Sequence, residues 1–161
     1  MVKGKNLFTT DEVEYLKLLH KQLPTTFHNQ DVNLFHINKT NINHIDNPQW
    51  DVIQNKLFDF HGRRCPVTNY FLKYSIGSYA VVHRDNPITV DGTAITLLDR
   101  SDDLEGGDII TVGEDKQRKT IPQLVGQTVY YDSAVIHGVS KVTKGTRIVL
   151  ITWFRKDTWQ N

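Results

Sequence analysis

The sequence predicts a mainly β protein with flanking helices, folded as a double-stranded β-helix (jelly roll). From Pro66 onward, short runs rich in β-branched and aromatic residues alternate with turn residues, which is typical of β-sandwiches and barrels. Before that point, two stretches instead carry apolar residues at helical spacing. The 161 residues are enough for one domain with a sizeable core. We therefore expect a single domain over residues 1–161, with an N-terminal extension over 1–65 and a jelly-roll core over 66–154.

A first helix is expected to begin after Thr9. Thr9 and Glu12 stand at the spacing of a capping box, in which two side chains satisfy free backbone N–H groups at the helix start. An apolar stripe follows at helical intervals until Pro24, made of Val13, Leu16, Leu19 and Leu23. Residues 31–37 are rich in Val, Leu, Phe and Ile and predict a strand. Residues 38–47 are polar and rich in asparagine, which predicts a loop.

A second helix is expected to begin at Asn47-Pro48. Asparagine is a favoured N-cap, and proline is favoured at the first helical position. Gly62 then supplies a C-cap, after apolar residues at helical spacing, which are Trp50, Ile53, Leu57 and Phe60. We expect both helices to pack against one outer face of a sheet.

Eight short strands are expected in the remainder of the chain, because runs of strand-forming residues are separated by glycine, proline and polar turns. Eight strands fit a jelly roll. The expected strands cover residues 67–74, 79–85, 93–98, 107–112, 118–121, 128–132, 137–142 and 147–154.

The bulk composition excludes several classes of protein. The net charge is +1, which does not favour a nucleic-acid or membrane-surface partner. Cys65 is the only cysteine, so no disulfide forms within the chain, and a reducing cytoplasm suits the protein. The N-terminus lacks the apolar segment of a signal peptide, and no apolar run reaches membrane-spanning length. We expect a cytoplasmic protein.

Three residues form a candidate metal site. Side chains alternate along a strand, so His83 and Asp85 point the same way. They supply two of the three ligands of the facial triad of non-haem Fe(II) oxygenases, which has two histidines and one carboxylate. His137, on a later strand, is the candidate third ligand. The ordinary alternatives are a surface pair or a hydrogen-bonded turn for the first two, and a backbone hydrogen bond for His137. The other five histidines lie in unrelated contexts.

The order of motifs along the chain resembles a known family. His83-Arg84-Asp85-Asn86-Pro87 is followed by Glu105-Gly106-Gly107-Asp108, His137-Gly138-Val139, Gly145-Thr146-Arg147 and Trp153-Phe154. This series, over residues 68–154, resembles the catalytic domain of the 2-oxoglutarate-dependent Fe(II) dioxygenases, in particular the prolyl 4-hydroxylase-like group. The first motif, with Asp91-Gly92, is similar to the hypoxia-sensing prolyl hydroxylases and their bacterial relatives. The resemblance implies the jelly roll, Fe(II) and 2-oxoglutarate.

Arg147 is expected on the inward face of the last strand. By alternation it shares that face with Val149, Ile151 and Trp153, and a buried cation is costly unless it is paired. The resemblance implies that the partner is the distal carboxylate of 2-oxoglutarate, which a guanidinium can bind in bidentate fashion. The alternative is a salt bridge to an aspartate of this chain.

Tyr74 stands nine residues before His83 and matches a tyrosine of the family. The resemblance implies a phenol close to the metal and the cosubstrate, and a core tyrosine is the alternative. The run Leu97-Leu98-Asp99 departs from the family, where a tyrosine in this run often helps the arginine to hold 2-oxoglutarate. The second partner beside Arg147 is therefore open, with Thr96 as a candidate.

The resemblance predicts an enzyme that hydroxylates a prolyl residue in a peptide or protein and releases succinate and CO2, with ascorbate as a reductant. A polar loop over residues 85–93, leading out of the metal site, is expected to contact such a peptide. The alternatives are a same-fold oxygenase acting on a free amino acid or a nucleic-acid base, and a non-oxidative cupin-like metal-binding protein, which would not need Arg147. The sequence does not determine the substrate or the oligomeric state.

Overall fold

The computed structural model describes residues 1–156. Its strands form one ten-stranded antiparallel sheet in the order β1-β8-β5-β10-β4-β9-β6-β7, with β3 also paired to β4 and β2 to β3. The helices are α1 (Thr10–Gln22) and α2 (Pro48–His61). The strands are β1 (Val2–Lys5), β2 (Thr26–Asp31), β3 (Leu34–Ile42), β4 (Val67–His83), β5 (Val90–Arg100), β6 (Ile109–Val112), β7 (Arg118–Ile121), β8 (Thr128–Asp132), β9 (Ile136–Val139) and β10 (Arg147–Arg155).

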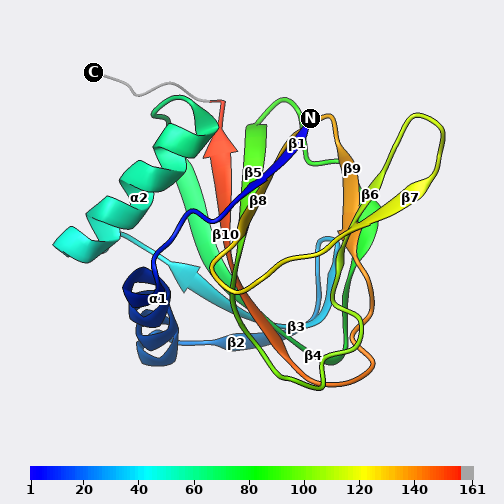
Figure 1. Cartoon of the computed structure of the whole chain (residues 1–161), viewed down its shortest axis with the longest axis horizontal. Coiled ribbons are helices and arrows are strands. Elements are labelled where there is room, and N and C mark those ends of the chain that lie inside the picture. Colours follow the sequence, from blue (N-terminus) through cyan, green and yellow to red (C-terminus); the bar gives the residue numbers. More distant parts are fainter. Residues whose placement is uncertain (157–161) are drawn as a thin grey trace.

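Strand β4 is the element around which the sheet curls into two layers. Its first part pairs with β10 and β3, and its last residues pair with β9, where His83 lies opposite His137. Gly77 lies between these two parts with a φ of 92°, a conformation that glycine adopts without steric cost. The predicted strands 67–74 and 79–85 are therefore one bent strand, which ends at His83, so Asp85 lies just beyond it. The curled sheet with flanking helices confirms the predicted fold class (Figure 1).

Both helices form where the local signals predict them. The capping box of α1 is complete, because the Glu12 N–H donates to Thr9 Oγ1 and the Thr9 N–H donates to Glu12 Oε1. Helix α2 begins after Asn47, whose side chain accepts a hydrogen bond from the Gln49 N–H, and ends at Gly62, which has a φ of 101°. Capping depends on residues close in sequence, which is why these boundaries were predictable.

The segment between the helices differs from the prediction. Residues 26–42 form a hairpin of β2 and β3, so the strand predicted over 31–37 and the loop predicted over 38–47 are wrong in their extent. Residues 38–42 pair with β4 instead. A sheet ladder uses backbone groups, so tertiary pairing can override a polar composition. Strand β1, which pairs with β8, was not predicted.

Two hydrophobic cores lie on opposite faces of the large layer formed by β8, β5, β10 and the first part of β4. Helices α1 and α2 cover the outer face, as expected, and Figure 1 shows them on the opposite side of this layer from the β6–β7 hairpin. Alternation along β10 divides the strand between the cores: Leu150 and Phe154 pack toward the helices, whereas Val149 and Ile151 face the inner core. The inner core, enclosed by the curl of the sheet, surrounds the site.

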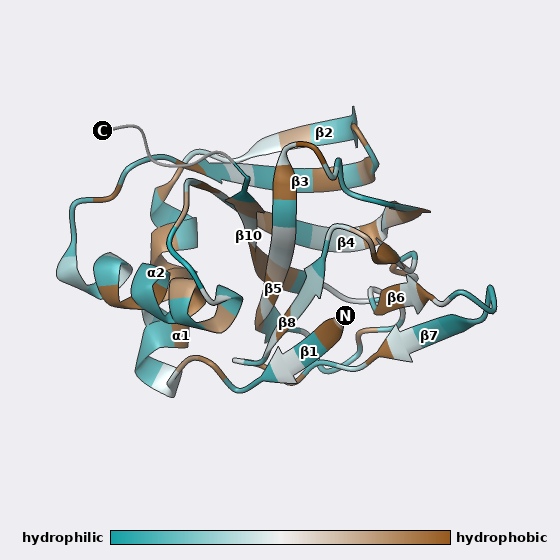
Figure 2. Ribbon diagram, turned by 90° about the horizontal axis from the view of Figure 1, so that it is seen from above, coloured by the Kyte–Doolittle hydropathy of each residue, from teal (hydrophilic) through white to brown (hydrophobic). Residues whose placement is uncertain are grey.

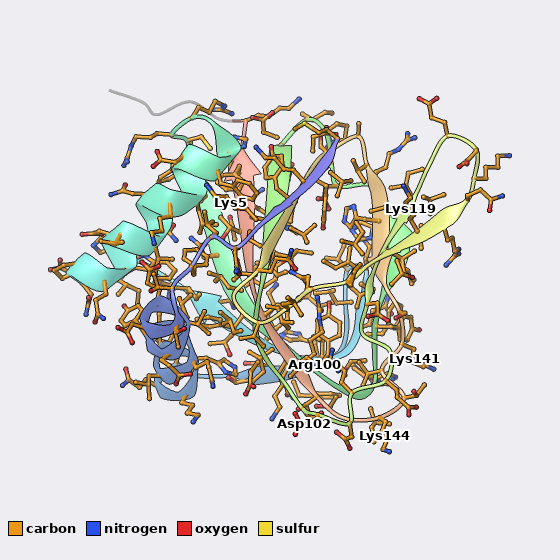
Figure 3. All side chains as sticks on the ribbon, in the orientation of Figure 1. Lys5, Arg100, Asp102, Lys119, Lys141 and Lys144 are labelled. Carbon is orange, nitrogen blue, oxygen red and sulfur yellow. The ribbon has the colours of Figure 1, made fainter. Side chains whose placement is uncertain are left out.

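Charged side chains lie mainly on the outside of the molecule. Lys119, Lys141 and Lys144, labelled in Figure 3, are exposed on strands and turns away from the helices. In Figure 2, hydrophilic and hydrophobic segments alternate along both helices, as expected for helices with one face on the sheet. Neither helix among residues 1–156 has the length and apolar character needed to cross a membrane.

Candidate metal and cosubstrate site

A cavity of about 340 Å³ lies on the inner side of the curled sheet. Its walls come from β4, β5, β8, β9 and β10, and its rim includes the β2–β3 turn at Val32 and Asn33. The three predicted metal ligands line it, together with the predicted residues Tyr74 and Trp153. The sheet thus brings together residues that are far apart in the sequence.

His83, Asp85 and His137 form a group whose potential ligand atoms all lie within 4.8 Å of one another. The Nε2 atoms of His83 and His137 each lie 3.4 Å from Asp85 Oδ1. The β4–β9 register places the two histidines opposite each other, and Asp85 follows the end of β4 by two residues. The structure therefore gathers the predicted ligands at one point.

Hydrogen bonds orient each of the three side chains. His83 Nδ1 lies 2.7 Å from the Val81 carbonyl oxygen, and His137 Nδ1 lies 2.9 Å from the Val135 carbonyl oxygen. Because a carbonyl only accepts, each Nδ1 carries a proton, and each Nε2 is the ring atom left to bind a metal. Thr93 Oγ1 donates to Asp85 Oδ2 at 2.7 Å, which leaves Oδ1 directed at the histidines.

The charges at this point favour an ionised carboxylate. Burial by itself would raise the pKa of the Asp85 carboxyl, but hydrogen bonds from His137, His83 and Thr93 outweigh it and hold the pKa well below its usual range. Burial opposes protonation of His83, but its contacts with Asp85 and the Val81 carbonyl raise the pKa overall. Two imidazole nitrogens and one carboxylate oxygen form a donor set that fits Fe(II).

Arg147 is buried without a carboxylate partner. Its side chain is 3% exposed, and no ion pair to it occurs among residues 1–156. Nη2 donates to Gln123 Oε1 at 3.0 Å, whereas Nη1 is buried with no partner in the described chain. Burial lowers the pKa of the guanidinium, and Tyr74 and Asp108 oppose this shift. An orphaned, buried cationic donor fits a site for an anionic group.

Tyr74 lines the cavity and is the cross-strand neighbour of Arg147. It faces Arg147 in the β4–β10 register, and its ring centroid lies 5.1 Å from the guanidinium carbon. Tyr74 lines the cavity and Arg147 does not. Thr96 is not a partner of Arg147, because it bonds to Thr128 Oγ1 at 2.7 Å and lies on the helix-covered face of β5.

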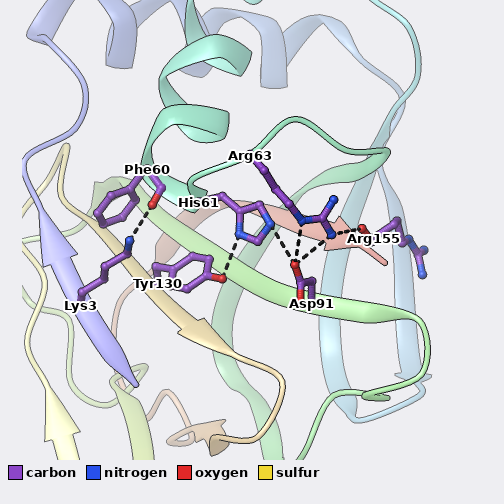
Figure 4. A network of polar contacts seen from close by, with 7 residues as sticks. All are labelled: Lys3, Phe60, His61, Arg63, Asp91, Tyr130 and Arg155. Atoms are coloured by element: carbon purple, nitrogen blue, oxygen red, sulfur yellow. Dashed lines mark hydrogen bonds and ion pairs between the residues drawn. The ribbon is translucent and has the colours of Figure 1, made fainter. Parts of the chain in front are cut away.

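A polar network on the outer face fixes the start of β5 (Figure 4). Asp91 Oδ2 accepts a hydrogen bond of 2.9 Å from Arg63 Nη2 and lies 3.2 Å from His61 Nε2. His61 Nδ1 in turn lies 2.9 Å from the Tyr130 hydroxyl, whose pKa burial and nearby acids raise to about 12. A Cβ on Gly92 would lie 2.2 Å from that hydroxyl oxygen. This close packing fixes the backbone of β5 at Gly92, which directly precedes Thr93.

The family model described as the 2OG-Fe(II) oxygenase superfamily matches residues 67–155, more than half of the chain. The chain belongs to this superfamily. Among curated proteins, a PKHD-type hydroxylase of Picosynechococcus sp. is 32% identical over 91 residues, covering 53% of this chain and 41% of that protein. The chain thus spans about two fifths of this relative's length.

Solved structures share the fold at low sequence identity. A 2OG-Fe(II) oxygenase of Burkholderia pseudomallei matches with a TM-score of 0.78 at 16% identity, over 99% of this chain and 88% of that one. A Trichoplax adhaerens prolyl hydroxylase in complex with a hypoxia-inducible-factor peptide matches with a TM-score of 0.73 at 14% identity, over 95% and 83%. HygX of Streptomyces hygroscopicus, with nickel, 2-oxoglutarate and hygromycin B bound, matches with a TM-score of 0.70 at 15% identity, over 99% and 85%.

The family model confirms the predicted 2-oxoglutarate/Fe(II) oxygenase family. The solved structures show that the chain shares its fold with prolyl hydroxylases. Two polar side chains at the site were not predicted: Gln123, which precedes β8, and Thr93 on β5. Both are common residue types: Gln123 contacts Arg147, which is 24 residues away, and Thr93 contacts Asp85, eight residues away across the turn into β5. Gly107 belongs to the Glu105-Gly106-Gly107-Asp108 motif, and a Cβ there would lie 3.3 Å from Arg147 Cδ, so this glycine makes room for the arginine.

Proposed function

We propose that the protein is an Fe(II)- and 2-oxoglutarate-dependent dioxygenase that hydroxylates a prolyl residue in a peptide or protein. Succinate and CO2 are the co-products, and ascorbate serves as a reductant. The observation that carries the proposal is the convergence of His83 Nε2, His137 Nε2 and Asp85 Oδ1, each directed by a hydrogen bond made elsewhere on the same side chain.

Each residue of the site has a separate task. His83, Asp85 and His137 would hold the metal at the wall of the cavity. Bound iron, with 2-oxoglutarate and oxygen, supplies the oxidation of a C–H bond. Arg147 binds the distal carboxylate of 2-oxoglutarate through Nη1, by a charge-assisted hydrogen bond. Since Tyr74 lines the cavity beside the guanidinium, its phenol would form one wall of the cosubstrate site.

The aromatic lining of the cavity supports a prolyl substrate. Tyr70 and Trp153 meet edge to face, with ring centroids 5.7 Å apart, and both line the cavity. Such a corner offers flat apolar walls to a pyrrolidine ring. The loop expected over residues 85–93 is shorter than predicted, because β5 begins at Val90. Asn86 and Thr89 still line the cavity and lie where an extended peptide would pass.

A free amino acid is the second candidate substrate, because an ion pair also lines the cavity. Lys39 Nζ lies 2.9 Å from Asp31 Oδ2, and Lys39 lies 4.7 Å from the Tyr70 ring centroid. The carboxylate and ammonium of a zwitterion would find partners of opposite charge in this pair. A peptide-bound proline carries neither charge, so the two candidates differ in their need for Lys39 and Asp31.

Two experiments test the proposal in sequence. Anaerobic addition of Fe(II) and 2-oxoglutarate is expected to produce a visible charge-transfer absorption band, which Asp85→Ala should abolish. Incubation in air with proline-containing peptides, or with free proline, should then give succinate and a product heavier by one oxygen atom. Hydroxylated peptide supports the proposal, and turnover of free proline alone, lost in Lys39→Met, supports the second candidate. Absence of the absorption band from the wild-type protein would contradict both.

A further inference from the structure

Gln123 holds Arg147 in place through both ends of its amide. Its Oε1 accepts the Arg147 Nη2 hydrogen bond at 3.0 Å, while its Nε2 donates to the carbonyl oxygens of Ile95 at 2.9 Å and Gln127 at 3.1 Å. The two carbonyls accept only from the nitrogen end, so they fix which end of the amide faces the guanidinium. Gln123 is thus itself positioned, by backbone groups of β5 and of the segment before β8.

Gln123 is uncharged, and this matters for anion binding as much as its geometry does. A buried guanidinium is commonly held by a carboxylate, which neutralises its charge. Here an amide oxygen orients Nη2, and Nη1 is left buried without a partner among residues 1–156. An arginine that is held in position without a hydrogen-bonded carboxylate keeps a charged donor for an anion.

Leu97 does not hold the guanidinium of Arg147, so another residue has to do so. Leu97 is an apolar member of the inner core and offers the guanidinium no side-chain hydrogen bond. Its backbone instead supports the segment that carries Gln123, because the Leu97 N–H donates to the Gln127 carbonyl and the Leu97 carbonyl accepts from the Gly126 N–H.

We propose that Gln123 is a positioning residue for the cosubstrate, which presents Arg147 to the distal carboxylate of a 2-oxo dicarboxylic acid without neutralising it. This inference rests on the proposed function, in which Arg147 binds that carboxylate. It predicts that a change at Gln123 alters the discrimination between 2-oxo acids with and without a distal carboxylate. Metal binding at His83, Asp85 and His137 should not change.

The test compares binding of 2-oxoglutarate with binding of 2-oxobutyrate, which lacks the distal carboxylate, to the full chain loaded with Mn(II). Gln123→Glu is expected to weaken 2-oxoglutarate binding at least tenfold, because its carboxylate pairs with Arg147. Gln123→Leu should weaken it less, because it removes the orienting bond without adding a competing charge. Neither variant should change the dissociation constant of 2-oxobutyrate or of Mn(II).

Gln127→Glu is the matched control, because it adds the same charge in the same segment. The Gln127 side chain accepts from the Leu124 N–H through Oε1, an interaction that glutamate can keep. The affinity of the Gln127→Glu variant for 2-oxoglutarate should stay within about twofold of that of the wild type. Equal losses for both 2-oxo acids, or unchanged 2-oxoglutarate binding in both Gln123 variants, would overturn the inference. A wild-type protein that binds Mn(II) but shows no preference for 2-oxoglutarate would instead refute the role of Arg147, and the inference with it.

Discussion

Replacing Thr93 by valine tests whether the orientation of Asp85 governs metal affinity. Valine keeps the shape of threonine but lacks the hydroxyl that donates to Asp85 Oδ2 at 2.7 Å. A hydrogen bond to a charged group is worth about 1.5–3 kcal/mol, and loss of a residue that orients a metal ligand typically costs about 10–100-fold in affinity. The two estimates agree, because about 1.4 kcal/mol corresponds to a tenfold change in affinity. We expect metal binding to weaken by about one to two orders of magnitude.

The assay is an anaerobic titration with Co(II), followed by its visible absorption, on protein freed of metal with a chelator. Thr93→Ser keeps the hydroxyl and should restore most of the affinity. Thr152→Val is the matched control, because Thr152 Oγ1 makes a buried bond of the same length, 2.7 Å, to Asn69 Oδ1. If Thr93→Val bound Co(II) as tightly as the wild type, the hydroxyl would have no part in orienting the carboxylate. If Thr152→Val lost as much affinity, the effect would be one of general stability.

Three further predictions follow from the site. Asp85→Ala and His137→Ala should each abolish detectable Co(II) binding while the circular-dichroism spectrum is retained; unchanged binding would exclude them as ligands. Arg147→Ala should weaken 2-oxoglutarate binding at least about tenfold in calorimetric titration, and an unchanged affinity would remove Arg147 from the cosubstrate site. Burial lowers the pKa of His61 from 6.5, so the unfolded chain binds more protons, and stability should fall as pH drops below about 6.5. His61→Gln should show a smaller decrease in melting temperature over that range, and an identical pH dependence in both proteins would contradict this.

The sequence by itself determined the elements whose signals are local. The capping box at Thr9 and the Asn47-Pro48 start placed both helices, because a cap depends on side chains within a few residues of the backbone groups that they satisfy. Strand alternation placed Arg147 and Trp153 on one face of β10 for the same reason. The spacing of His83 and Asp85, with the motifs that follow, was enough to indicate the family.

Tertiary structure decided everything that depends on which strands are neighbours. The β4–β9 register brings His137 opposite His83 across 54 residues of chain, a separation that no local pattern encodes. Pairing with β4 made residues 38–42 a strand despite their polar composition, since the ladder depends on the backbone. Gln123 can orient Arg147 only because Arg147 and the Ile95 carbonyl lie beside it in the fold. A glutamine in a loop has no distinctive pattern, and its role is set by the groups that folding places around it.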